Sequence, residues 1–141
     1  MGIKIVRQAL NVGDYMLAGP ASEIPVVDGK PMIVSVDSKM GIGEIASCCY
    51  QEHERFRDEC IRAKDLGIQL VILIEEMPPG GLLENWRSPM GKDGRPRYLF
   101  DPAHLKKVME TMTRKYNVKF RFCDGRSTGK ELIEYLKGVK K

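Results

Sequence analysis

No apolar run in this sequence approaches the roughly 20 residues that a helix needs to cross a bilayer. The first residues, Met1-Gly2-Ile3-Lys4, also lack the apolar core of a secretion signal. We therefore expect a soluble, cytoplasmic protein that has no membrane partner. Internal repeats and low-complexity tracts are absent as well, so the 141 residues predict a single domain over 1–141 with a core of ordinary size.

Paired cysteines are missing too. The four cysteines, Cys48, Cys49, Cys60 and Cys123, form no C-x-x-C motif of the kind that binds zinc. We expect three of them in one helix and the fourth at the end of a strand. Reduced thiols in such places act as small, buried apolar side chains.

Acidic residues are scarce in one part of the chain. Between Arg87 and Arg121, ten lysines and arginines face only Asp93, Asp101 and Glu110, whereas the whole chain has a net charge of +4. A basic block of this kind is typical of a surface that binds a polyanion. It is equally typical of a solvated helix face next to a soluble loop, and the charges alone leave both interpretations open.

Apolar alternation predicts two strands in the first third of the chain, over Ile3–Leu17 and Met32–Lys39. Side chains alternate between the two faces of a strand. In the second strand, Ser35, Asp37 and Lys39 therefore share one face, opposite the valines. This alternation points Asp37 and Lys39 in the same direction.

The remaining pattern predicts alternating helices and strands. We expect, in order, a helix over Glu44–Leu66, a strand buried on both faces over Ile68–Ile74, an irregular basic loop over 77–100, a helix that Asp101 caps, a strand over Val118–Cys123, and a last helix with a Thr128/Glu131 capping box. This order predicts an α/β domain in which helices cover a mixed sheet.

The chemistry of the sequence is concentrated at the ends of the first two strands. Antiparallel neighbours would bring Asp14 and Asp37 together, and two adjacent carboxylates are costly unless a cation joins them. Mg²⁺ prefers oxygen ligands, which here would be the two carboxylates and the backbone carbonyl of Ser38. Lys39 would assist a water molecule that attacks a phosphodiester. The alternative is a common Gly-Asp turn and a surface ion pair.

Four segments in this order resemble the XPF-type nuclease domain. They are GDYML at 13–17, VDSK at 36–39, RFRDECI at 55–61 and VILIE at 71–75, beside the family pattern GDY(I/L)…VERK…GR…C…LLIE. The resemblance covers most of the chain, and the family belongs to the PD-(D/E)xK superfamily. It implies a restriction-endonuclease-like mixed sheet flanked by helices and a metal-dependent DNA endonuclease that prefers branched or flapped DNA.

Carried over residue by residue, the resemblance makes Asp14 and Asp37 ligands of Mg²⁺ or Mn²⁺ and Lys39 the catalytic lysine. Ser38 stands where the family has arginine. The acid that the family places four residues after the lysine falls on Gly43 here, and Glu44 follows it. The family's first strand, with its D-x-R-E motif, has no counterpart, so the alternative function is a catalytically weak or inactive nuclease-like module that binds DNA.

Several residues are candidates for DNA contacts. Arg55 matches the arginine of the family's GR segment, and its alternative role is an exposed partner of Glu59. His53 falls on the predicted apolar stripe, so we expect a core histidine. In the loop, Trp86 would stack on bases, and the nearby cations would bind phosphates: Arg87, Lys92, Arg95 and Arg97. Trp86 would otherwise pack the loop down. An open sheet edge would also allow a homodimer.

Overall fold

A computed structural model describes residues 10, 12–16, 26, 27, 29–31 and 33–138. Its strands are β1 (Tyr15–Met16), β2 (Val26–Val27), β3 (Lys30–Pro31), β4 (Ile33–Lys39), β5 (Ile68–Ile74) and β6 (Lys119–Phe122). The α-helices are α1 (Ile42–Tyr50), α2 (His53–Asp65), α3 (Pro102–Tyr116) and α4 (Thr128–Leu136). Three short 3₁₀ helices are η2 (Pro79–Gly81), η3 (Leu83–Asn85) and η4 (Gly125–Ser127). No helix in these described ranges is long and apolar enough to cross a membrane.

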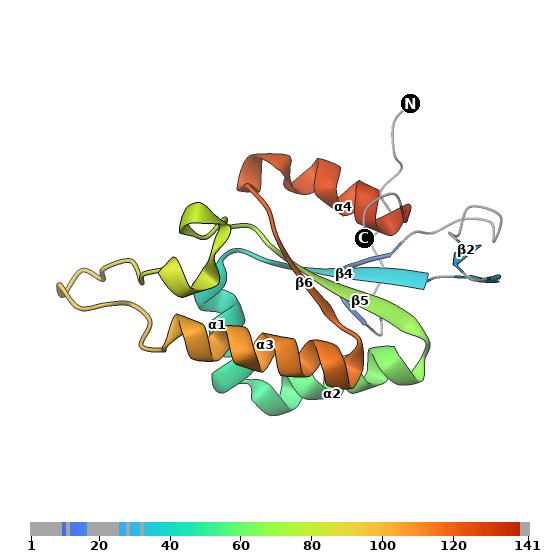
Figure 1. The fold of residues 1–141 in the computed structure, drawn as a ribbon, viewed down its shortest axis with the longest axis horizontal. Coiled ribbons are helices and arrows are strands. Elements are labelled where there is room, and N and C mark those ends of the chain that lie inside the picture. Colours follow the sequence, from blue (N-terminus) through green and yellow to red (C-terminus); the bar gives the residue numbers. More distant parts are fainter. Residues whose placement is uncertain (1–9, 11, 17–25, 28, 32, 139–141) are drawn as a thin grey trace.

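The main sheet has four strands in the order β1-β4-β5-β6. β1 is antiparallel to β4, with Tyr15 opposite Val36, whereas β4, β5 and β6 are parallel. The carboxyl ends of the three parallel strands therefore meet at one edge, where α1 begins and the loop after β5 projects (Figure 1). The prediction of a mixed sheet in an α/β domain is confirmed.

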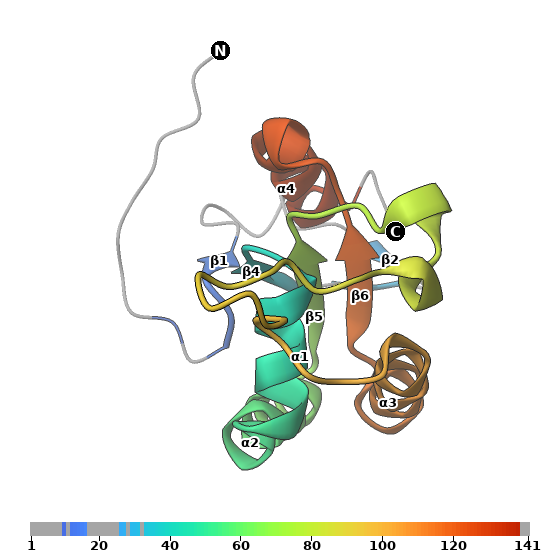
Figure 2. The ribbon, with the colours of Figure 1, turned by 90° about the vertical axis from the view of Figure 1, so that its left-hand side faces the viewer.

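Helices cover both faces of this sheet, with α1, α2 and α3 on one side and α4 on the other (Figure 2). The larger core cluster lies on the first side, where Leu70, Ile72 and Ile74 pack against apolar residues of the three helices. The smaller cluster joins Val34, Val36, Val71 and Leu73 to Tyr135 of α4. β5 is buried on both faces, as its continuous apolar run predicts.

The predicted helix over Glu44–Leu66 is wrong in one respect, because the structure has two helices there. The backbone leaves the helical region at Glu52 (φ −109°, ψ 29°), and the amides of Gln51 and Glu52 both donate to the carbonyl of Ser47. No glycine or proline lies at the break, so the sequence does not predict it. It changes the helical phase, so His53 is exposed at the start of α2 instead of lying in the core.

Other boundaries follow the sequence more closely. The first predicted strand, Ile3–Leu17, is seen at Tyr15–Met16, and most of its other residues lie outside the described part. Asp101 caps α3 by accepting from the amide of Ala103 at 3.0 Å, as predicted. The Thr128/Glu131 capping box is wrong, because Thr128 is already the first helical residue and its hydroxyl donates to the carbonyl of Gly125.

Candidate active site

Asp37 and Lys39 lie at the carboxyl end of β4 and face the same side of the sheet. They stand opposite Ile72 and Ile74 of β5, so both point toward the face that α1, α2 and α3 cover. The Asp37 side chain is buried (7% exposed), and its Oδ2 lies 3.4 Å from the Lys39 ammonium nitrogen. The alternation of β4 predicts this pairing, and the structure brings the two residues together.

Asp14 reaches the same end of β4 from the neighbouring chain segment. Its amide donates to the carbonyl of Val36 at 2.9 Å, and its Oδ2 accepts from the amide of Ser38 at 3.0 Å. The Asp14 carboxyl group also lies near enough to Asp37 to raise the pKa of that buried carboxyl group. The structure therefore places Asp14, Asp37 and Lys39 at one site.

Gly13 sets the direction in which Asp14 leaves the core. Its φ of +69° is left-handed, and a Cβ there would collide with the Ser35 hydroxyl, which donates to the carbonyl of Val12 at 2.6 Å. Val12 is buried, whereas Asp14 is exposed. The turn at Gly13 thus anchors one side of the Asp14 segment in the core and presents Asp14 to the site.

We expect Gly13→Ala to lower the free energy of unfolding by about 2–4 kcal/mol, because it adds a collision to the cost of a left-handed alanine. Gly67→Ala is the matched control, since Gly67 has the same φ of +69° but open space around its Cβ position. Denaturant unfolding of the two variants measures the difference. Equal losses would show that the contact with Ser35 places no constraint on this turn.

The electrostatics of the site make the Asp37 carboxyl group costly to ionise. Burial, the Asp14 carboxyl group and other nearby negative charges raise the pKa of Asp37 from 3.8 to about 8, although Lys39 acts to lower it. Burial alone would lower the pKa of Lys39, but Asp37, with Cys48 and Glu44, outweighs it and leaves that pKa raised. The buried Asp37 carboxyl group therefore keeps its proton to a higher pH than an exposed aspartate does.

Ser38 and Glu44 take different places. In a strand, the backbone groups of successive residues point alternately to the two neighbouring strands. The Ser38 amide points to Asp14, so strand geometry directs its carbonyl to that same side, and its role as a ligand stays a prediction. Glu44 instead accepts from the amide of Met40 at 2.6 Å and caps the chain that leads into α1.

Glu59 is a further acid that the sequence analysis missed. It lies on α2 near enough to Asp37 to raise the pKa of that carboxyl, and its buried Oε1 has no hydrogen-bond partner. In the sequence, the spacing of Glu59 from Arg55 indicates an exposed ion pair on one helix. Its proximity to Asp37 results from the packing of α2 over the sheet, which the sequence does not show. Within the described ranges, no group of three or more His, Cys, Asp or Glu side chains is already arranged to hold a metal.

The predicted DNA-contacting residues are spread over two regions. Arg55 is exposed in the first turn of α2, and no bond within the described part joins it to Asp14, Asp37 or Lys39. The other cations are exposed in the loop that projects beyond the carboxyl edge of the sheet: Arg87, Lys92, Arg95 and Arg97. We call this loop, residues 87–100, the tongue. Within it, the Gly91 amide donates to the carbonyl of Arg95 at 2.7 Å.

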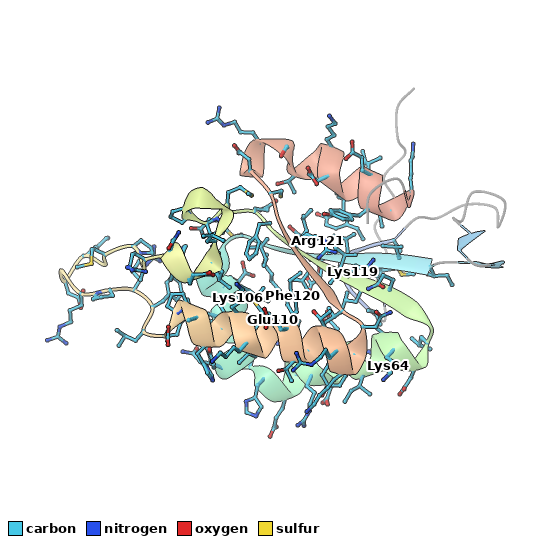
Figure 3. All side chains as sticks on the ribbon, viewed as in Figure 1. Lys64, Lys106, Glu110, Lys119, Phe120 and Arg121 are labelled. Carbon is cyan, nitrogen blue, oxygen red and sulfur yellow. The ribbon has the colours of Figure 1, made fainter. Side chains whose placement is uncertain are left out.

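The predicted basic block does not form one surface. On β6, Lys119 and Arg121 stand opposite Val71 and Leu73 and share the α4 side, whereas Phe120 faces the other helices (Figure 3). On α3, Lys106 pairs with Glu84 at 3.5 Å. The block in the sequence is therefore divided among the tongue, the outer face of α3 and the opposite face of the sheet.

Trp86 anchors the base of the tongue. It is 4% exposed and stacks on Phe100, with ring centroids 5.1 Å apart, so the structure shows it packing the loop down, not presenting an open face to a base. Its indole donates to Glu76 Oε2 at 2.7 Å, and Glu76 Oε1 accepts from the amide of Ile42 at 2.9 Å. Glu76 thus clamps the tongue to the first residue of α1, three positions after Lys39.

We expect Glu76→Ala to loosen the tongue, because it leaves the Trp86 indole and the Ile42 amide without their acceptor. Limited proteolysis within 87–100 should become about tenfold faster, corresponding to a loss of about 1–2 kcal/mol. Glu110→Ala, which removes an exposed acid on α3, is the control. An unchanged rate of cleavage in Glu76→Ala would mean that aromatic packing alone holds the tongue.

We found no family model, curated protein or solved structure that matches this chain.

Proposed function

We propose that the protein is a metal-dependent DNA endonuclease with a site of the XPF, PD-(D/E)xK type. The observation that carries this proposal is the meeting of Asp14, Asp37 and Lys39 at the carboxyl edge of β4. Two neighbouring carboxyl groups with an ammonium 3.4 Å from one of them are an arrangement suited to metal-assisted phosphodiester hydrolysis. A helix-covered sheet with one antiparallel and three parallel strands agrees with a restriction-endonuclease-like fold.

The donor atoms at this edge suit Mg²⁺ or Mn²⁺. Asp14 and Asp37 would supply carboxylate oxygens and Ser38 its carbonyl, and Mg²⁺ sites are often built from one or two carboxylates, with water and phosphate as the other ligands. A bound cation would offset the cost of ionising the buried Asp37, whose pKa is raised to about 8, and the buried Glu59 Oε1 nearby has no hydrogen-bond partner. When bound, the ion would lower the pKa of a water and polarise the phosphate.

The residues of the chain have separate roles in this proposal. Asp14 and Asp37 hold the ion, and the surrounding burial excludes bulk water from Asp37. Lys39 places a positive charge beside the position of the scissile phosphate, where it stabilises the charge that grows during attack. The exposed cations of the tongue, Arg87, Lys92, Arg95 and Arg97, lie at the same edge of the sheet and would contact the DNA backbone.

The direct test is cleavage of flapped, four-way and linear duplex DNA with Mg²⁺, Mn²⁺ or EDTA. We expect metal-dependent cleavage, with a preference for the branched substrates that follows from the resemblance. Asp58→Asn, an exposed aspartate of α2, is a control that should cut as the wild type does. Cleavage that persists in EDTA, or no cleavage of any substrate with either ion, would contradict the proposal.

A DNA-binding module without strong catalysis is the second candidate. One observation favours it, since the described residues hold no ready cluster of three metal-binding side chains. Binding would then depend on phosphate contacts, and the logarithm of the affinity would fall linearly with the logarithm of salt concentration. Salt-dependent binding of branched DNA together with no cleavage, by a protein whose fold is intact, would select this candidate over the nuclease.

A further inference from the structure

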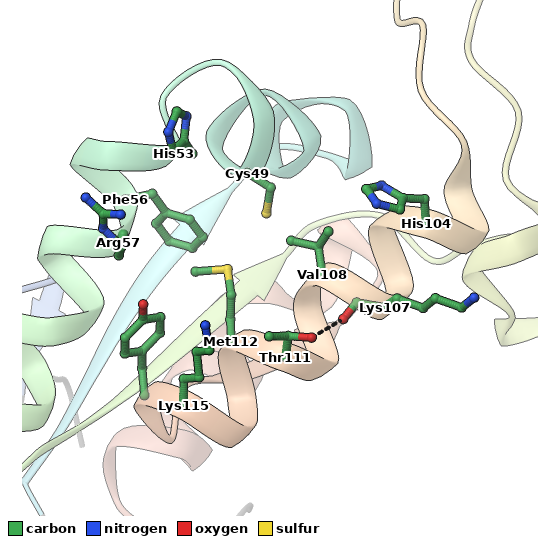
Figure 4. Close-up of a pocket in the computed structure, with 11 residues that line it drawn as sticks. Cys49, His53, Phe56, Arg57, His104, Lys107, Val108, Thr111, Met112 and Lys115 are labelled. Atoms are coloured by element: carbon green, nitrogen blue, oxygen red, sulfur yellow. Dashed lines mark hydrogen bonds between the residues drawn. The ribbon is translucent and has the colours of Figure 1, made fainter.

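Two neighbouring cavities on the helical side of the sheet share one lining residue, His104. The first, of about 620 Å³, lies between α1 and residues 96–101, where the tongue leads into α3. Tyr50, Arg97 and Tyr98 are among its lining residues. The second, of about 360 Å³, lies between α2 and α3, and Phe56, Arg57 and Lys107 line it. His104 lines both cavities, so we treat them together as the helical groove; Figure 4 shows the cavity between α2 and α3.

The groove has aromatic walls. The rings of Tyr50 and of His104, which lines both cavities, stack with centroids 5.7 Å apart, and the Tyr50 hydroxyl is 2.7 Å from His104 Nδ1. Phe100 lies against Tyr50 at 6.2 Å. Because His104 is exposed, this stack offers a ring surface to a ligand in the groove. Flat apolar surfaces of this kind accept nucleobases irrespective of sequence.

The charges around the groove are mostly positive. Exposed cations come from three elements: Arg97 from the tongue, Arg57 from α2, and Lys107 and Lys115 from α3. The acid among the lining residues is Asp101, whose Oδ1 already accepts from the Ala103 amide. Cations beside aromatic surfaces complement a single nucleic-acid strand better than an acidic peptide, since the peptide would use the charges but not the stacking surfaces.

The groove does not open on Asp37. Asp14, Asp37 and Lys39 are not among the residues that line either cavity, although Cys49, which lines one of them, lies close enough to Lys39 for its pKa to respond to that charge. The groove is therefore a surface next to the candidate active site and separate from it. A branched substrate that fills both places would present a second strand to the groove.

We propose that the helical groove binds a single, unpaired strand of DNA, with its bases against the Tyr50–His104 stack and its phosphates near Arg57, Arg97 and Lys107. In a branched substrate this would be the strand that the active site does not cut. The use of the groove during cleavage rests on the proposed function, but binding of a single strand to the groove can be measured without it.

The test is fluorescence anisotropy of a labelled 15-nucleotide oligothymidylate in EDTA, where no metal-dependent cleavage takes place. We expect Arg57→Glu/Lys107→Glu to weaken binding at least tenfold, and to reduce the slope of log affinity against log salt by about 1.4. His104→Ala should weaken binding about fivefold or more through lost stacking. Lys130→Glu, an exposed charge reversal on α4, is the matched control and should change binding less than twofold.

Three results would overturn the groove proposal: no binding of the oligonucleotide to the wild-type protein, equal effects of Arg57→Glu/Lys107→Glu and Lys130→Glu, or equally tight binding of a polyglutamate peptide that is insensitive to His104→Ala. Circular dichroism of each variant excludes unfolding as the cause. Cleavage of linear duplex DNA by Arg57→Glu/Lys107→Glu then separates the two proposals. Retained cleavage with lost strand binding supports both, whereas strand binding without cleavage by the wild type removes only the nuclease.

Discussion

Asp37→Asn is expected to abolish metal-dependent cleavage and, at the same time, to stabilise the metal-free protein near pH 8. The loss of activity should exceed about 100-fold, because the variant removes a charged ligand whose ion supplies several kcal/mol of transition-state stabilisation. Asparagine has the size of aspartate but cannot ionise. The buried site therefore no longer has to hold a second carboxylate beside Asp14.

The sign of the stability change follows from the pKa of Asp37. In the folded protein this pKa is raised from 3.8 to about 8, so the folded state keeps a proton that the unfolded state has lost between those pH values. The free energy of unfolding of the wild type therefore falls as pH rises through this window. We expect Asp37→Asn to be more stable by about 1–3 kcal/mol at pH 8 in EDTA, with little difference at pH 4.

Thermal unfolding in EDTA at several pH values measures this effect. Adding Mn²⁺ should then stabilise the wild type and leave Asp37→Asn unchanged, since a ligand stabilises only a protein that binds it. Asp58→Asn, which alters an exposed aspartate, should follow the wild type throughout. A variant at Asp37 that is less stable than the wild type at pH 8 would contradict the raised pKa of this carboxyl group.

Lys39→Met should lower the rate of cleavage about 100-fold or more while the protein still binds Mn²⁺. The methionine keeps much of the length of the side chain, but it removes the ammonium that lies 3.4 Å from Asp37. A side chain that transfers a proton or stabilises developing charge typically contributes 10²-fold or more to the rate. We expect Mn²⁺ binding to persist because Lys39 is not a ligand of the ion.

Single-turnover cleavage with saturating Mn²⁺ separates this effect from a loss of metal affinity. Lys39→Arg is the informative companion, because it keeps the charge but presents a planar guanidinium in place of a compact ammonium. We expect its rate to lie between those of the wild type and Lys39→Met. If Lys39→Met cleaved within about twofold of the wild type, Lys39 would be only an ion-pair partner of Asp37.

The features that the sequence predicts well are those set by local periodicity. The alternation of Ser35, Asp37 and Lys39 in β4, the continuous apolar run of β5 and the Asp101 cap of α3 all agree with the structure. Each depends on strand or helix geometry within a few residues. The position of Asp14 is an exception, because it depends on the pairing of β1 with β4, two segments about twenty residues apart that the sequence analysis expected to be antiparallel neighbours.

The features that the sequence does not predict depend on contacts between distant segments. Helix α2 separates from α1 without a glycine or proline, and the resulting change of phase moves His53 to the surface. Trp86 is buried because Glu76, ten residues earlier, accepts from its indole. Glu59 is brought near Asp37 only by the packing of α2 over the sheet. None of these contacts leaves a pattern in the nearby sequence.

The most direct test of the account is calorimetric titration of Mn²⁺ into the wild type, Asp14→Asn, Asp37→Asn and the control Asp58→Asn at pH 7.5. The proposed site predicts a saturable binding event in the wild type and Asp58→Asn, and its loss in both site variants. Absence of binding to the wild type, or binding that survives in Asp37→Asn, would contradict a metal centre formed by Asp14 and Asp37.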